Sequence, residues 1–197
     1  PNFEPSLLPS ADWRGRPLRD GARHRSVMTP QGQRWYYEFS FALIPQSVGQ
    51  LNLPVAQATV QPLTAPGAIP ATPILLEMKD PTQLAVKPKP TAARDGLPAE
   101  GIHLRAWFQP QVSRAEVGQA LTLWVQVAGQ GISSDQLPSL ANQLQRPGYE
   151  LHLQDAQRQH WADAEGHLYA ELIERYQLIP RNAGLLSLPA LQVHWFD

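Results

Sequence analysis

Histidine and acidic side chains crowd into a short stretch in the second half of the chain, between residues 152 and 167. They are His152, Asp155, His160, Asp163, Glu165 and His167. Imidazole nitrogens and carboxylate oxygens are usual ligands of zinc. The stretch lacks the H-E-x-x-H spacing of a helical zinc site, and the run D-A-E-G at 163–166 indicates a polar turn in which Gly166 supplies the turn conformation. We therefore favour a solvated hairpin over a metal site and expect no bound metal.

Other motifs with catalytic potential are incomplete. The stretch G-Q-G-I-S-S at 129–134 follows an expected strand, but it lacks the third glycine, the lysine and the long helix of a phosphate-binding loop. Ser133, Ser134 and Asp135 lack the G-x-S-x-G pattern of a nucleophilic serine. The chain has no cysteine, which excludes disulfides, thiolate metal sites and a cysteine nucleophile. We expect no catalytic residue, no cofactor and no enzymatic activity.

The densest charge run is basic and lies near the beginning of the chain. It comprises Arg14, Arg16, Arg19, Arg23, His24 and Arg25. Such a run could bind phosphate or lipid headgroups. Because no aromatic residues are interleaved in the run, we favour a solvated, twisted hairpin. The net charge of −1 and the mild difference between the two halves argue against a nucleic-acid partner.

The elements that must position these side chains are strands. The segment F-S-F-A-L-I-P-Q-S-V-G-Q-L-N-L-P-V-A-Q at 39–57 resembles E-R-Y-Q-L-I-P-R-N-A-G-L-L-S-L-P-A-L-Q at 174–192. A repeat with so long a period indicates duplicated domains rather than a solenoid. In the first copy the alternating apolar side chains from Tyr37 to Leu43 predict a strand, Pro45 ends it, Gly49 makes the turn and a second strand returns. The second copy repeats this pattern.

Further patterns predict the rest of the fold. Val-, Leu-, Thr- and Trp-rich segments predict strands at 72–78, 102–108, 120–128 and 149–153, and one short helix is expected at 136–144 with Asp135 as its cap. Short strands, many Pro and Gly turns and little helix indicate an all-β chain of two tandem Ig-like β-sandwich domains. We expect residues 1–79 to be the C-terminal portion of a first domain, 80–99 a Pro-rich linker and 100–197 a second domain lacking its last strand, so that both are truncated.

A family resemblance lies in the second copy of the repeat and the segments before it. Y-Q-L-I-P-R-N-A-G-L-L-S-L-P-A-L-Q-V-H-W-F-D from Tyr176, V-G-Q-A-L-T-L from Val117 and G-I-S-S-D-Q-L-P from Gly131 together resemble the BatD family of bacterial oxygen-tolerance, or aerotolerance, proteins. The first copy, F-A-L-I-P-Q-S-V-G-Q-L-N-L-P, resembles the preceding domain of that family.

This resemblance implies tandem Ig-like domains in the periplasm or elsewhere outside the cytoplasm, anchored to the inner membrane by segments outside the present chain. It implies two kinds of partner, which are membrane proteins with von Willebrand A domains and a MoxR-type ATPase system. It implies no catalytic residues. The physiological setting would be envelope stress or oxygen tolerance.

Two classes of function remain open. The favoured one is a non-enzymatic protein-interaction module, because the sequence offers a rigid framework and no convergent polar site. Its candidate partner-binding residues are Asp135, Asp163 and Glu165, whose loop carboxylates could reach the metal of a von Willebrand A domain, and Trp161, which we expect to lie exposed in a polar loop. The alternative is a carbohydrate-binding or other ligand-binding module that uses Trp161 and neighbouring acids. Two coplanar, exposed tryptophan rings on a concave surface would favour that alternative.

Overall fold

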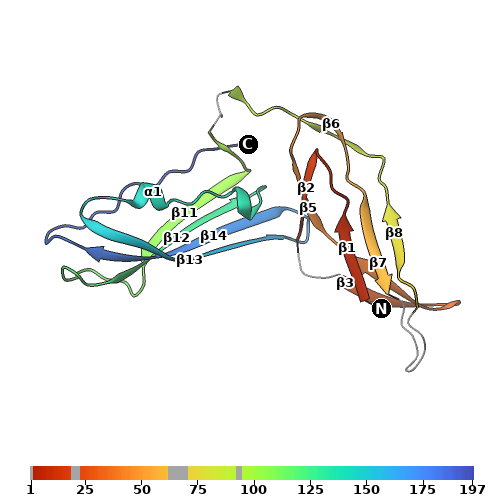
Figure 1. Ribbon diagram of the computed structural model, residues 1–197, viewed down its shortest axis with the longest axis horizontal. Coiled ribbons are helices and arrows are strands. Elements are labelled where there is room, and N and C mark those ends of the chain that lie inside the picture. Colours follow the sequence, from red (N-terminus) through yellow and green to blue (C-terminus); the bar gives the residue numbers. More distant parts are fainter. Residues whose placement is uncertain (1, 19–22, 62–70, 92–94) are drawn as a thin grey trace. The chain divides into compact units, whose positions relative to one another are not determined.

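The computed structural model describes residues 2–18, 23–61, 71–91 and 95–197, and these form two compact units, 1–88 and 89–197. Arg19 of the basic run lies outside the described residues. Both units consist mainly of antiparallel strands, with one 3-10 turn and one α-helical turn among the described elements. The expected all-β, sandwich-like fold class is confirmed (Figure 1). Among the described residues, no helix is long and apolar enough to cross a membrane.

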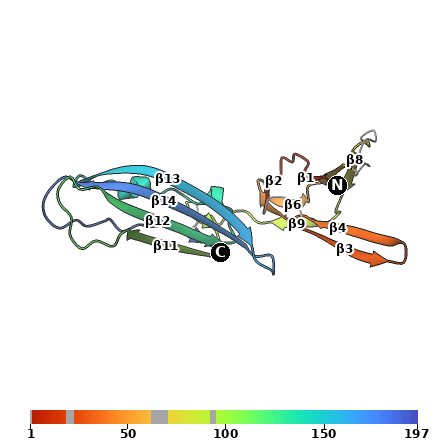
Figure 2. The same cartoon turned by 90° about the horizontal axis from the view of Figure 1, so that it is seen from below.

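In its described residues, the first unit contains one three-stranded sheet and three strand pairs. The sheet has the order β1-β7-β8, with β1 at Asn2–Leu7, β7 at Ala56–Gln61 and β8 at Ile74–Met78. The pairs are β2 (Trp13–Pro17) with β5 (Phe41–Pro45), β3 (Arg23–Thr29) with β4 (Gly32–Glu38), and β6 (Gly49–Asn52) with β9 (Gln83–Val86). Figure 2 shows β3 and β4 as a long hairpin that reaches beyond the neighbouring strands of the unit.

Two expectations for the first unit need adjustment. The strand expected from Tyr37 to Leu43 is divided between β4 and β5, because the chain changes its pairing partner from β3 to β2 at residues 39–40. Strand β9 lies inside the stretch expected to be a linker, and Leu84 of β9 pairs with Leu51 of β6. The division between the two units, after Pro88, nevertheless falls within that Pro-rich stretch.

The second unit is a long four-stranded antiparallel sheet whose core lies on one face. Its order is β11-β12-β14-β13, with β11 at Gly101–Phe108, β12 at Leu121–Gln130, β14 at Leu168–Pro180 and β13 at Tyr149–Ala162. Buried and half-buried residues alternate strictly along β12 and on most of β14, which is the pattern of a sheet with one covered face. A short parallel pair, β10 (Leu97–Pro98) with β15 (Trp195–Phe196), completes the unit.

Two irregular segments cover the core face of this sheet. The first contains the 3-10 turn η2 (Ser134–Gln136) and the helical turn α1 (Ala141–Leu144), and it contributes the fully buried side chains of Ile132, Leu137, Leu140 and Leu144. The second contributes the partly buried Leu186, Leu188, Leu191 and Val193. These aliphatic side chains pack against Leu123, Val125 and Leu172, and this burial supplies most of the stability of the unit.

The predicted short helix is interrupted. Pro138 has no N–H and disfavours helical backbone in the residue before it, and Leu137 is accordingly extended with φ −68° and ψ 130°. The chain therefore forms the turn η2 first and α1 only after the proline. Asp135, which was expected to cap the helix, lies inside η2, and Ser133 takes the N-cap position of that turn.

The two copies of the repeat share their first half and differ in their second. Pro45 ends β5 and Pro180 ends β14, and the glycines that follow, Gly49 and Gly184, both have positive φ angles of 114° and 134°. In the first copy the chain then returns as β6. In the second copy it returns as an irregular segment that packs through its leucines and has no ladder of its own.

Candidate functional site

The candidate site is the turn that joins β13 and β14, together with the last residue pairs of those strands. Strand β13 is much longer than the expected 149–153 and runs on to Ala162. Its register carries a bulge at Gln154, between Leu153, which pairs with Tyr176, and Asp155, which pairs with Arg175. A bulge inserts one unpaired residue, so every side chain beyond it changes face. This places Trp161 opposite Tyr169, on the face of the sheet away from the core.

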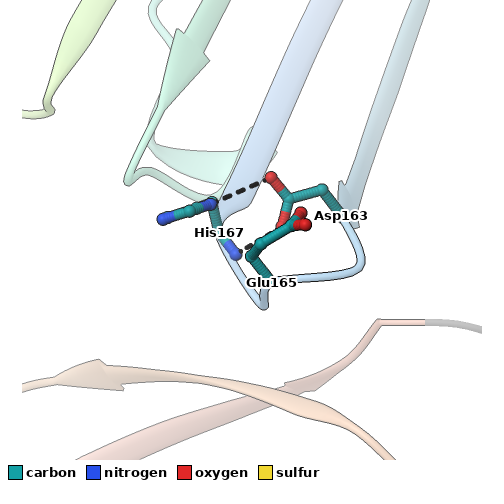
Figure 3. A group of neighbouring side chains, drawn as sticks. All are labelled: Asp163, Glu165 and His167. Carbon is teal, nitrogen blue, oxygen red and sulfur yellow. Dashed lines mark hydrogen bonds and ion pairs between the residues drawn. The ribbon is translucent and has the colours of Figure 1, made fainter.

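The polar turn itself is built by Asp163. Its carboxylate accepts a hydrogen bond from the backbone N–H of His167 at 2.8 Å, and its second oxygen lies 3.0 Å from His167 Nδ1 (Figure 3). The backbone N–H of Gly166 donates to the carbonyl of Asp163 at 3.3 Å, and Gly166 has a φ of 93°. A positive φ is costly for residues with a Cβ, so Gly166 is the residue that permits the turn. The expected solvated hairpin turn is present.

Three potential metal ligands meet in this turn. One ligand atom each from Asp163, Glu165 and His167 lie within 4.8 Å of one another. A mixed set of one imidazole and two carboxylates suits zinc better than calcium, which prefers oxygen ligands alone. The sequence cluster had included His152, Asp155 and His160 as well, but these lie along β13, where the strand separates them from the turn. We call Asp163, Glu165 and His167 the acidic tip.

The hydrogen bond between Asp163 and His167 shifts the pKa values of these two residues in opposite directions. The hydrogen bond to Asp163 and its negative charge raise the pKa of His167. Partial burial acts to raise the pKa of Asp163, but the hydrogen bonds from the side chain and backbone of His167 outweigh it, so that this pKa is lowered. The charges of Glu100 and Glu165 also act to raise the pKa of His167. The surroundings of His167 are therefore net negative.

An aromatic pair lies beside the acidic tip. The rings of Trp161 and Tyr169 are stacked with centroids 5.9 Å apart and planes 17° apart. Trp161 lies within β13 and not in the expected loop, because the strand runs on to Ala162, but its ring is exposed as expected, at 42%. The Tyr169 hydroxyl lies 3.4 Å from Asp163 Oδ2, and partial burial and then the charge of Asp163 raise the pKa of that hydroxyl. The Trp161–Tyr169 pair thus offers an apolar ring surface next to the carboxylates of Asp163 and Glu165.

Asp135 occupies a separate position on η2. It is exposed, and its carboxylate accepts a hydrogen bond from Ser133 Oγ at 2.6 Å. The turn is held against β13 by Arg158, which donates to the carbonyls of Ser134 and Leu137, and by a contact of 3.1 Å between Ser134 Oγ and His160 Nδ1. The structure thus brings together three of the four candidate residues, Trp161, Asp163 and Glu165, and Asp135 is not part of their cluster.

The sequence reasoning did not single out His167 and Tyr169 as partners of the candidate residues. His167 was recognised as one of six clustered residues, and the i,i+4 spacing from Asp163 across a glycine turn is a signal that could have paired the two. The stacking of Tyr169 on Trp161 depends on the register of the hairpin, which the bulge at Gln154 alters. No local pattern reveals that register.

A second group of tryptophans bears on the carbohydrate alternative. Trp107 and Trp124 lie on the face away from the core with their planes 9° apart and their centroids separated by 6.2 Å. Both are half-buried, and a guanidinium lies over each ring, that of Arg105 at 4.9 Å and that of Arg175 at 5.8 Å. These rings are parallel, but they do not form an exposed platform on which a sugar could stack.

Comparisons of the chain with models of known protein families, with curated proteins and with solved structures give no match.

Proposed function

We propose that the chain is a non-enzymatic protein-interaction module that contacts its partner through the acidic tip and the neighbouring Trp161–Tyr169 pair. The observation that carries the proposal is the meeting of Trp161, Asp163 and Glu165 at one end of a long hairpin, where all three are at least partly exposed. An exposed aromatic anchor beside charged groups is a common composition of a binding hot spot. The rest of the hairpin supplies a rigid support.

The resemblance to BatD proteins supports an extracytoplasmic setting and a von Willebrand A domain as the partner, with a MoxR-type ATPase in the same system. In the proposed contact the exposed carboxylate of Glu165 completes the coordination of a metal ion held by the partner. Asp163 is hydrogen-bonded to His167, and these bonds close the turn that carries Glu165. Trp161 packs against apolar surface next to the metal.

Isothermal titration of the 197-residue chain into a purified von Willebrand A domain, with and without Mg²⁺, tests the proposal. We expect Glu165→Gln to weaken binding by at least tenfold when Mg²⁺ is present, and to have little effect when the ion is removed with EDTA. Trp161→Ala should weaken binding in both conditions, because its contribution does not depend on the metal.

The matched control is Glu116→Gln, which removes one exposed carboxylate from a different part of the same unit. Binding that is equally strong for wild type, Glu165→Gln and the variant with Asp135→Asn, Asp163→Asn and Glu165→Gln combined would rule out a metal-bridged contact. Binding that survives all these changes but is lost with Trp161→Ala would leave an interaction module that uses the aromatic pair alone.

A further inference from the structure

The β3–β4 hairpin of the first unit carries a surface that the proposed function does not use. Each of the two strands pairs only with the other among the described elements, and together they extend away from the neighbouring strands (Figure 2). Strand β3 contains the second half of the basic run, Arg23, His24 and Arg25. The sequence of the basic run contains no Phe, Trp or Tyr, which is why the sequence alone favours a solvated hairpin over a binding surface.

The register of the hairpin places aromatic residues directly opposite the basic ones. Arg25 pairs with Tyr36 and Ser26 pairs with Trp35, and the Arg25 guanidinium lies 5.2 Å from the centre of the Tyr36 ring. A third arginine, Arg34, pairs with Val27 nearer the turn. Basic and aromatic side chains are therefore interleaved across the two strands, although they are separated along the sequence.

Strand alternation gives the hairpin two different faces. One face carries Arg25, Val27, Arg34 and Tyr36, with Arg23 opposite Glu38 at its base. The other carries His24, Met28, Trp35 and Tyr37. Near the base of this second face, the Tyr37 ring stacks on Phe3 of β1 with centroids 4.5 Å apart, which fixes the hairpin to its unit.

Beyond that anchor, large apolar side chains are open to solvent. Met28 is 80% exposed, Trp35 51%, Tyr36 46% and Val27 40%. Solvent contact of apolar area on this scale is unfavourable, at about 25 cal/mol per Å². The hairpin thus combines these four exposed apolar side chains with three arginines. Such a surface indicates a binding site for a partner that has both apolar and anionic groups.

We propose that the β3–β4 hairpin binds the surface of an anionic lipid bilayer. The hairpin enters tip first, so residues of both faces meet the bilayer. Met28 and Val27, which lie nearer the turn, enter the acyl boundary, and the amphipathic rings of Trp35 and Tyr36 settle at the headgroup level. Arg25 and Arg34 interact with lipid phosphates, since arginine forms paired hydrogen bonds with such groups. A nucleic acid would match the arginines and the rings, but it has no apolar phase for Met28 and Val27. This inference is independent of the proposed role of the acidic tip.

Flotation of the 197-residue chain with lipid vesicles tests the inference. Vesicles of phosphatidylcholine containing about one third phosphatidylglycerol should carry the protein at low salt and release most of it at about 1 M salt, where charges are screened within a few ångströms. Pure phosphatidylcholine vesicles should bind it at least tenfold more weakly. Arg25→Gln with Arg34→Gln should reduce partitioning to the anionic vesicles roughly 30-fold.

Three controls make the outcome decisive. Arg114→Gln with Arg146→Gln removes the same charge from exposed positions of the second unit and should leave partitioning within about twofold of wild type. Arg25→Lys with Arg34→Lys keeps the charge and should retain most of the binding. Met28→Ser with Trp35→Ser should lower partitioning at least tenfold, and the far-ultraviolet circular dichroism of each variant shows that it is folded.

Equal binding to neutral and anionic vesicles, equal losses in the two arginine-to-glutamine variants, or no flotation with any vesicle would overturn the inference. So would binding to a single-stranded or double-stranded oligonucleotide that is tighter than binding to the vesicles and is unaffected by Met28→Ser with Trp35→Ser. That last result would assign the hairpin to nucleic acid instead.

Discussion

The hydroxyl of Tyr176 donates a hydrogen bond to the Glu174 carboxylate at 2.7 Å within the core of the second unit, where Glu174 is only 2% exposed. The two side chains lie two residues apart on β14 and point to the same face. The same carboxylate oxygen lies 3.4 Å from the backbone N–H of Leu140, at the N-cap of α1. A buried acid thus joins the sheet to the segment that covers it.

Replacing Tyr176 with phenylalanine is expected to destabilise the second unit by about 2 kcal/mol. The substitution keeps the ring but removes a donor from a buried carboxylate, and such a loss costs about 1–3 kcal/mol. Urea denaturation followed by circular dichroism measures the change. Tyr169→Phe is the control, because its hydroxyl lies 3.4 Å from a partly exposed carboxylate and its loss should cost under about 0.5 kcal/mol. Equal losses in the two variants would contradict the assigned role of Glu174.

The pair of Asp163 and His167 predicts a pH window for the turn. The folded-state pKa of His167 is raised above 6.5, so its contribution to stability is complete below 6.5 and is lost as the pH rises through the folded value. The pKa of Asp163 is lowered below 3.8, so its contribution is present above 3.8 and is lost as the pH falls through the folded value. The turn should be best ordered between these limits.

NMR titration of the His167 ring checks this window. In wild type the ring should titrate above 6.5, and Asp163→Asn should bring the pKa down because the hydrogen bond to a charged acceptor is lost. Glu116→Gln, at a separate site in the same unit, should leave the titration unchanged. Added Zn²⁺ would compete with the proton for the ring, so a pKa that falls on zinc addition would show that the acidic tip can hold a cation by itself.

Gly166→Ala is expected to lower the free energy of unfolding by about 1 kcal/mol, since alanine strains the backbone at a φ of 93°. No heavy atom lies within 4 Å of the position that the new Cβ would take, so the loss reports backbone strain and not a clash. Gly148→Ala is the matched control, because its Cβ would also meet open space and its φ is not positive. Chemical denaturation that finds both variants equally stable would contradict the left-handed conformation of Gly166.

Arg158→Gln should release η2 from β13. The guanidinium donates to two carbonyls of that segment, and glutamine is too short to reach both. Hydrogen exchange measured by mass spectrometry should become faster in peptides covering 133–140, while peptides covering β12 keep their protection. Arg146→Gln, which removes an exposed arginine that bonds to the carbonyl of its neighbour, should change neither.

The parts of the fold that follow from local patterns were predictable. The Leu-, Val-, Thr- and Trp-rich composition of L-T-L-W-V-Q-V-A indicated strand β12, and the prolines and glycines of the repeat marked the ends of β5 and β14. The expected exposure of Trp161 and the polar turn at 163–166 also follow from composition. These features depend on residues that are neighbours in sequence.

The parts that depend on pairing between distant residues were not predictable. Residues 154–162 are mostly polar because β13 lies at the edge of the sheet and its core-side residues, such as Arg158 and His160, contact the polar turn η2 and not the apolar core. Their sequence therefore gives no strand signal. The aromatic neighbours of the basic run come from the opposite strand of the hairpin, and only the register brings Tyr36 to Arg25.

The bulge at Gln154 shifts the pairing of β13 with β14 by one residue. Every side chain from Asp155 to Ala162 is assigned to its face by this one extra residue. If β13 paired straight through Gln154 without the bulge, the sequence would be the same but Gln154 would lie opposite Arg175 and His160 opposite Tyr169. Trp161 would then move to the side of the sheet that faces η2. A single irregularity of pairing, at a site remote from the turn, thus decides whether the contact surface exists at the end of the hairpin.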